Sequence, residues 1–155
     1  ILDNQNFIEY SPLGLKYLKE IINLIKKNNG GLLIIDYGYK EKQMKDTLQG
    51  IFKKKYTNIL KNIGRSDITY NINFNMFENI IKNSKNLNSI VTTQKKFLIN
   101  MGIKQRAEII SKNKKFSEIT DIYYRLKRLI DDKEMGNLFK VMLIKKSNNN
   151  FQTGF

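Results

Sequence analysis

Residues 31–39 read Gly-Leu-Leu-Ile-Ile-Asp-Tyr-Gly-Tyr, and this stretch decides the fold class. Its apolar run, Leu32 to Ile35, is typical of a parallel strand that is buried on both faces. Asp36-Tyr37-Gly38 then ends the run with residues that favour a turn. Before it, Ser11-Pro12 and Gly30-Gly31 bracket a segment with apolar residues at helical spacing: Tyr17, Leu18, Ile21, Ile22 and Ile25. A helix followed by a buried strand predicts an α/β sheet.

Further elements follow along the chain. Asp67 to Phe74 alternates strictly between polar and apolar residues and predicts one strand. Segment 40–64 is predicted to be irregular, with a short helical or strand piece near residues 48–55. Later patterns predict a short helix through Met76 to Ile81, strands at 88–92 and 138–145, and helices after Thr93, around Ala107 and from Ser117. We expect one domain, residues 1–146, and a flexible tail, residues 147–155.

Composition limits the chemistry that is available. The chain has 155 residues, 41% of them hydrophobic and one of them proline, which suits a single globular domain. No stretch approaches the roughly 20 apolar residues of a membrane span. Cysteine and histidine are absent, which excludes disulfides, thiol or imidazole catalysis and nearly all zinc sites. Because the chain starts at Ile1 without the pattern of a signal peptide, we expect it to begin inside a longer protein.

The net charge is +14, from 28 Lys and Arg against 14 Asp and Glu. Such a balance raises the alternative of a basic nucleic-acid-binding domain. Arginine, the better phosphate ligand, is confined to Arg65, Arg106, Arg125 and Arg128, and the lysines are spread along the chain. Compositional drift toward Lys, Ile and Asn therefore explains the charge better than a nucleic-acid surface does.

Four blocks, taken in order, carry a family resemblance: residues 33–39 (Leu-Ile-Ile-Asp-Tyr-Gly-Tyr), 46–49 (Asp-Thr-Leu-Gln), 67–74 and 135–141 (Met-Gly-Asn-Leu-Phe-Lys-Val). A fifth combines Thr93-Gln94, Phe97-Leu98 and Met101-Gly102-Ile103. The ordered set is similar to the MidA-like S-adenosylmethionine-dependent methyltransferases. The mitochondrial member of that family methylates an arginine on a respiratory complex I subunit and is required for assembly of the complex.

The resemblance runs from Glu9 nearly to Ile144 and corresponds to the C-terminal half of a family member. It implies an α/β fold that is the C-terminal portion of a Rossmann-like class I sheet, with three or four strands and an antiparallel edge strand. It also implies S-adenosylmethionine as cofactor, bound by an upstream half with a glycine-rich turn. This chain has no G-x-G, and Gly30-Gly31 precedes a strand, so we expect no cofactor-binding or metal-binding residue here.

The matching blocks supply candidate site residues. Asp36 and Tyr37, at the carboxyl end of a strand where α/β proteins bind ligands, and Asn71 and Asn73 are candidate catalytic residues. Asp46, Thr47, Gln49, Asp67, Thr69 and Gln94 are candidate substrate-binding residues. Carboxylates such as Asp36, Asp46 or Asp67 could hold the guanidinium of an arginine acceptor. The alternative for Asp36 is a cap on the following turn, and the block 135–141 fits sheet closure better than a site.

Two departures from the family pattern affect this prediction. The family shows Thr-Ala-His-Val-Asp-Phe where residues 69–74 read Thr-Tyr-Asn-Ile-Asn-Phe, so asparagines replace a histidine and an aspartate, and Lys45 replaces a usual glycine. The sequence therefore predicts a methyltransferase half that acts on a protein partner, such as a complex I subunit, in a bacterial cytoplasm or a mitochondrial matrix. The alternative is a degenerate, non-catalytic remnant or assembly protein.

Overall fold

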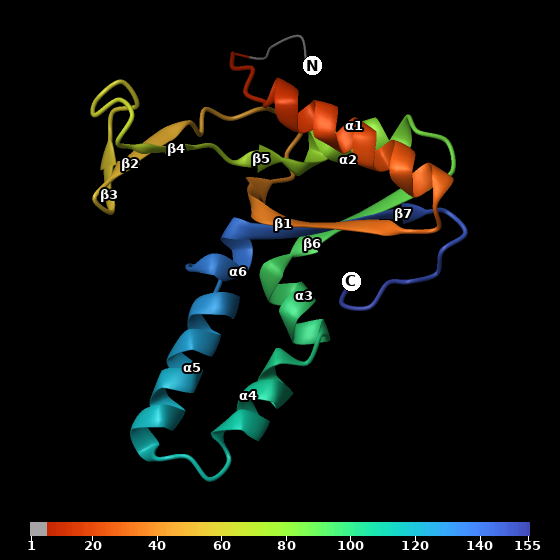
Figure 1. Ribbon diagram of the computed structural model, residues 1–155. Helices are drawn as coiled ribbons and strands as arrows, with labels where there is room; N and C mark the ends of the chain where they lie inside the picture. Colours follow the sequence, from red (N-terminus) through yellow and green to blue (C-terminus); the bar gives the residue numbers. More distant parts are fainter. Residues whose placement is uncertain (1–5) are drawn as a thin grey trace.

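The computed structural model describes residues 6–155, which contain both helices and strands (Figure 1). The N-terminal part contains α1 (Pro12–Lys27), β1 (Gly31–Tyr39), β2 (Gln49–Phe52), β3 (Lys55–Thr57), β4 (Asp67–Thr69) and β5 (Ile72–Asn73). The C-terminal part contains α2 (Phe74–Lys82), β6 (Leu87–Thr93), α3 (Gln94–Asn100), α4 (Ile103–Ser111), α5 (Phe116–Ile130), α6 (Met135–Leu138) and β7 (Phe139–Lys146). Residues 1–5 of the predicted domain lie outside the described residues.

The main sheet has four strands in the order β5-β1-β7-β6. β7 pairs antiparallel with β1 and with β6, whereas β5 pairs parallel with β1. The α/β class with one antiparallel strand is therefore confirmed, and β7 lies one position inside the β6 edge. The prediction that residues 32–35 form a parallel strand was wrong for these residues, because all four pair with residues 141–144 of antiparallel β7.

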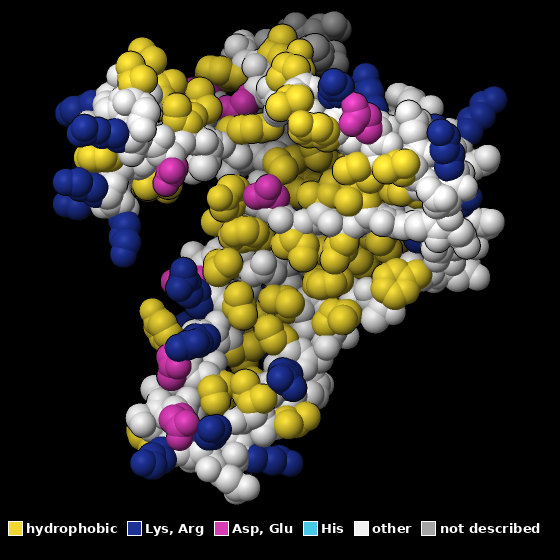
Figure 2. All heavy atoms as spheres, viewed as in Figure 1, with side chains coloured by type: hydrophobic (Ala, Val, Ile, Leu, Met, Phe, Trp, Pro, Cys, Tyr) yellow, Lys and Arg dark blue, Asp and Glu magenta, His cyan; other side chains and the backbone are white. Residues whose placement is uncertain are grey.

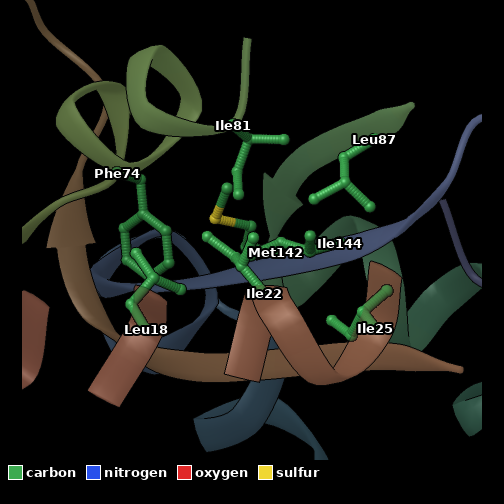
Figure 3. Packing of buried hydrophobic residues seen from close by; sticks show 8 residues of the cluster. All are labelled: Leu18, Ile22, Ile25, Phe74, Ile81, Leu87, Met142 and Ile144. Atoms are coloured by element: carbon green, nitrogen blue, oxygen red, sulfur yellow. The ribbon is translucent and has the colours of Figure 1, made fainter. Parts of the chain in front are cut away.

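α1 and α2 cover one face of this sheet. Ser11 caps α1 by accepting a hydrogen bond from Gly14 N, and Pro12 follows at the first helical position, as predicted. Figure 3 shows side chains of both helices around Met142 and Ile144 of β7. The buried cluster comprises Leu18, Ile22, Ile25, Phe74, Ile81, Leu87, Met142 and Ile144. Each fully buried side chain contributes roughly 1.5–3 kcal/mol to stability, so this layer is the core of the described chain.

The opposite face is covered unevenly. Val141 and Leu143 of β7 are buried there, but their cross-strand partners Ile35 and Leu33 are 49% and 47% exposed. Beside them, the outer edge of β1 pairs only at Gly38 and Tyr39, with β5, so among residues 6–155 no strand occupies the edge along residues 31–37. The prediction that this strand is buried on both faces does not hold within this chain.

A second, three-stranded sheet, in the order β3-β2-β4, stands apart from the main sheet (Figure 1). It contains the piece predicted near residues 48–55, which forms a β-hairpin. It also divides the strand predicted for residues 67–74. β4 belongs to the small sheet, β5 belongs to the main sheet, and Phe74 already starts α2. The single strand was a wrong prediction, because Thr69 pairs with Gln49 of β2 whereas Ile72 pairs with Gly38 of β1, and Asn73 then caps α2.

α4 and α5 form a helical arm on the other side of the main sheet (Figure 1). Within the described part of the chain, no helix combines the length and the apolar character that crossing a bilayer requires. The C-terminal residues, expected to be flexible, contact α3. The rings of Phe97 and Phe155 lie 5.2 Å apart, and Asn100 Nδ2 donates to the Gly154 carbonyl oxygen at 3.3 Å. The last two residues of the tail thus contact α3.

Candidate functional site

The carboxyl end of β1 carries Asp36 and Tyr37. Tyr37 N donates a hydrogen bond to Asp36 Oδ1 at 2.8 Å. Both residues lie inside β1, which continues to Tyr39, so the turn predicted at residues 36–38 and a cap on it were wrong. The Tyr37 ring packs on Phe139 with 4.9 Å between ring centroids, so Tyr37 has a packing role. Gly38 follows, and β5 approaches it so closely that a Cβ atom there would lie 2.2 Å from the Ile72 carbonyl oxygen. This approach places Asn71 and Asn73 beside the end of β1.

Glu9 joins three segments at this place. Its carboxylate accepts hydrogen bonds from Thr47 N at 3.1 Å and from the Thr47 hydroxyl, and that hydroxyl accepts one from Asn71 N at 2.8 Å. The N-terminal segment, the loop before β2 and the segment between β4 and β5 are thereby held together. Sequence reasoning missed Glu9, although it opens the matching Glu-Tyr-Ser-Pro segment, because its partner lies 38 residues away.

Tyr70 lies beside the same residues. Burial raises the pKa of the Tyr70 phenol above its ordinary value, hydrogen bonds from the side chain and backbone of Ser11 oppose this, and the charges of Glu9 and Asp36 raise the pKa further. Two carboxylates therefore act on one phenol at the strand end.

We expect Tyr70→Phe to alter the pH dependence of stability. Because the folded-state pKa is raised, the contribution of Tyr70 is fully present below its unfolded pKa of about 10. It is lost as the pH rises through the folded-state pKa. Urea unfolding from about pH 8 to about pH 11 should show a shallower loss of stability for Tyr70→Phe than for the wild type. Parallel curves would contradict this assignment.

The other predicted residues lie at different places. Gln49 Nε2 donates to Thr69 Oγ1 at 3.1 Å, which joins β2 to β4 just beyond Thr47. Asn73 is buried and accepts a hydrogen bond from Met76 N at 3.1 Å as the N-cap of α2. Asp46 is exposed next to Thr47, and Asp67 is exposed opposite Ile51 in the small sheet. Gln94 is not part of this group, because it is buried and donates to the Leu129 carbonyl oxygen, tying α3 to α5.

Two cavities border the strand end. One, of about 420 Å³, lies beside Asn73 between the N-terminal segment and α2, and its lining includes Ile8, Tyr10 and Met76. The other, of about 600 Å³, is lined by Gly38 and by Lys40, Lys45 and Lys140 with the single acid Glu41. Burial lowers the pKa of Lys140, Glu41 raises it and Lys45 lowers it. The second cavity therefore favours an anionic occupant.

Comparison with known proteins agrees with this architecture. Residues 2–93, more than half of the chain, match the family described as "Putative S-adenosyl-L-methionine-dependent methyltransferase". The chain is 28% identical over 137 residues to the mitochondrial protein arginine methyltransferase NDUFAF7 of Xenopus tropicalis, covering 88% of this chain and 31% of that protein. The Xenopus laevis protein is 25% identical, again with 88% and 31% covered. The chain thus spans about a third of the length of these relatives.

Solved structures share the fold. A crystal structure of an uncharacterized superfamily protein from Burkholderia thailandensis superposes with a TM-score of 0.78 at 20% identity, covering 94% of this chain and 40% of that one. A superfamily member from the same organism, bound to S-adenosyl-homocysteine, gives a TM-score of 0.68 at 22% identity, with 81% and 34% covered. The match over residues 2–93, with the mixed sheet and the blocks at the end of β1, shows that the chain belongs to this family of S-adenosyl-L-methionine-dependent methyltransferases.

Proposed function

We propose that this chain is the acceptor-side part of an S-adenosylmethionine-dependent protein methyltransferase, and that a cofactor-binding part docks along the free edge of β1. The observation that carries the proposal is the uneven cover of the main sheet. Leu33 and Ile35 are about half exposed on the face where their β7 partners are buried. An apolar face next to an unpaired strand edge is stabilised by a further strand and its helices.

The lengths of the relatives support the proposal that the docking part belongs to the same kind of methyltransferase. The chain covers 31% of the Xenopus tropicalis methyltransferase and 40% of a structural neighbour that matches nearly all of it. Those proteins therefore contain much more chain than is present here. A docked strand at β1 would extend the sheet past Leu33 and Ile35, and it would bring its own carboxyl end next to Asp36.

In the completed enzyme, S-adenosylmethionine supplies an electrophilic methyl group. The residues of this chain would bind and orient the acceptor, because in-line positioning provides most of the acceleration of a methyl transfer. Asp36 and Glu9 are two carboxylates whose charges act on Tyr70, and a carboxylate is the group that a guanidinium binds best. An arginine acceptor is also what the name of the NDUFAF7 relatives indicates. Thr47, Asn71 and Gln49 would position the loop that faces it.

The resemblance to the MidA-like family also suggests the acceptor protein and the compartment. A respiratory complex I subunit, or its bacterial equivalent, is the acceptor that the MidA-like family implies. The enzyme would then act in a bacterial cytoplasm or in a mitochondrial matrix.

Isothermal titration with S-adenosylmethionine tests the proposal. The chain alone is expected to give no binding heat, because it contains no glycine-rich turn after a strand. The chain copurified with the segment encoded directly upstream should bind the cofactor and methylate an arginine peptide. Cofactor binding by the isolated chain would overturn the proposal that a separate part of the enzyme binds the cofactor.

A matched pair of variants locates the docking surface. Leu33→Lys/Ile35→Lys places charges on the uncovered face and should abolish copurification with the upstream segment, since a buried unpaired charge is strongly unfavourable. Leu24→Lys, on the outer surface of α1 and 57% exposed, should leave copurification unchanged. Circular dichroism verifies that each variant is folded. If both variants copurified equally well, docking at β1 would be excluded.

The second candidate, a non-catalytic remnant, was favoured by the two asparagines that depart from the family pattern. The position of Asn73 weakens that argument. Its side chain caps α2 through Met76 N, and asparagine and aspartate are about equally good N-caps. One of the two departures therefore preserves a structural role.

A further inference from the structure

We propose that the small sheet is a basic finger that binds an acidic segment of the acceptor protein and presents the neighbouring methyl-accepting residue to the end of β1. The finger is defined here as residues 49–69, which include β2, β3 and β4. This inference rests on the proposed methyltransferase function and adds to it the class of acceptor.

The finger carries five cations and one acid, Asp67, at its base. From Thr47 to Ser66 the sequence contains Lys53, Lys54, Lys55, Lys61 and Arg65 and no Asp or Glu. Every salt bridge formed among residues 6–155 involves cations outside the finger. Figure 2 shows Lys and Arg side chains gathered around this small sheet. An anionic partner is therefore the complementary one.

Apolar side chains accompany this charge and indicate a polypeptide partner. Tyr56, Leu60 and Ile63 are 80%, 76% and 81% exposed on the same finger. The aliphatic side chains of Leu60 and Ile63 gain nothing from a phosphate backbone, whereas an amphipathic protein segment can cover them together with the lysines. Lysine also predominates over arginine in the finger, which is the opposite of the preference at phosphate sites.

The tip of the finger is held in a demanding conformation. Phe52 pairs with Lys55, so Lys53 and Lys54 form a two-residue hairpin turn, with φ of 50° and 64°. Such a turn favours Asn-Gly, and a lysine in this region is strained. Lysines therefore occupy two turn positions at which the backbone favours asparagine and glycine.

The base of the finger leads directly into the site. β2 begins two residues after Thr47, β4 ends two residues before Asn71, and the Gln49 to Thr69 hydrogen bond closes the base. The length of β2 corresponds to roughly 13 Å, which an extended peptide spans in about four residues. Acidic residues bound at the tip would thus lie about four positions from the residue presented at Tyr70. The lysine-lined cavity beside Gly38 offers further room for anionic flanks.

Fluorescence anisotropy with the full chain tests the finger. The probe is a labelled peptide with one arginine and a glutamate block about four residues away, compared with a peptide that carries glutamines instead. The glutamate peptide should bind more tightly, and its binding should weaken as salt is added. Lys53→Asn/Lys54→Gly should weaken this binding about fivefold through the loss of two ion pairs. The same variant should melt about 2–4 °C higher, because it relaxes the turn.

The control and the alternatives have separate outcomes. Lys16→Gln/Lys19→Gln removes two exposed charges from α1 and should leave peptide binding unchanged. If this control lost as much peptide affinity as the finger variant, net charge alone would explain the effect and the proposal would be overturned. Tighter binding of polyuridine RNA or of phosphatidylglycerol vesicles than of the glutamate peptide would overturn it in favour of those partners. Cofactor binding by the reassembled enzyme is measured separately. Loss of the peptide-binding proposal can therefore be distinguished from loss of the methyltransferase proposal.

Discussion

Gly38→Ala is expected to cost about 3 kcal/mol of unfolding free energy. A Cβ atom at this position would lie 2.2 Å from the Ile72 carbonyl oxygen and 2.7 Å from a ring carbon of Phe74. Relief requires β5 to separate from β1, and Phe74 is fully buried, so the core beneath α2 would be disturbed as well. The midpoint of urea unfolding should fall accordingly, and Asn71 should lose its place beside the strand end.

Two controls isolate the cause. Gly30→Ala should be nearly neutral, because a Cβ atom there meets no atom within 4 Å. Phe74→Leu should not rescue Gly38→Ala, since the nearest obstacle is the backbone oxygen of Ile72 and not the ring. A restored midpoint in the double variant would show instead that the ring contact sets the cost.

Thr47→Val should destabilise the chain by about 2 kcal/mol. The Thr47 hydroxyl donates to Glu9 and accepts from Asn71 N at 2.8 Å, and valine leaves both groups without that partner while keeping the size of the side chain. Hydrogen exchange at the Asn71 amide should become faster, because the bond that protects it is lost. Urea unfolding and exchange mass spectrometry measure the two effects.

Thr47→Ser is the matched control for the hydroxyl. Serine keeps both hydrogen bonds and removes one methyl group, so its cost should stay below about 1 kcal/mol. If Thr47→Ser and Thr47→Val lost equal unfolding free energy, the effect would come from packing. The hydrogen bond from Thr47 to Glu9 would then not stabilise the site. In the assembly proposed above, Thr47→Val should also lower methyl transfer, through displacement of the loop that carries Gln49.

Local patterns in the sequence predicted much of the fold. Ser11 and Pro12 start α1 as expected, Thr93 caps α3, and the apolar run after Gly31 forms β1. Each of these signals depends on neighbours within a few residues, so it survives any tertiary arrangement. The order of the matching blocks likewise indicated the methyltransferase family. The hairpin of the finger was not predicted as such, because Lys53-Lys54 lacks the Asn-Gly signature of its turn.

The sequence by itself determined where α1, α3 and β1 form and which family the chain resembles, since capping, periodicity and motif order are properties of the chain. Only the tertiary structure decided that residues 67–74 divide between two sheets, that Gln94 supports α5 and that Glu9 meets Thr47 and Asn71. It alone left Leu33 and Ile35 uncovered beside an open edge. The physical reason is that an apolar pattern requires burial against some partner, whereas the identity of that partner depends on packing between residues far apart in the chain.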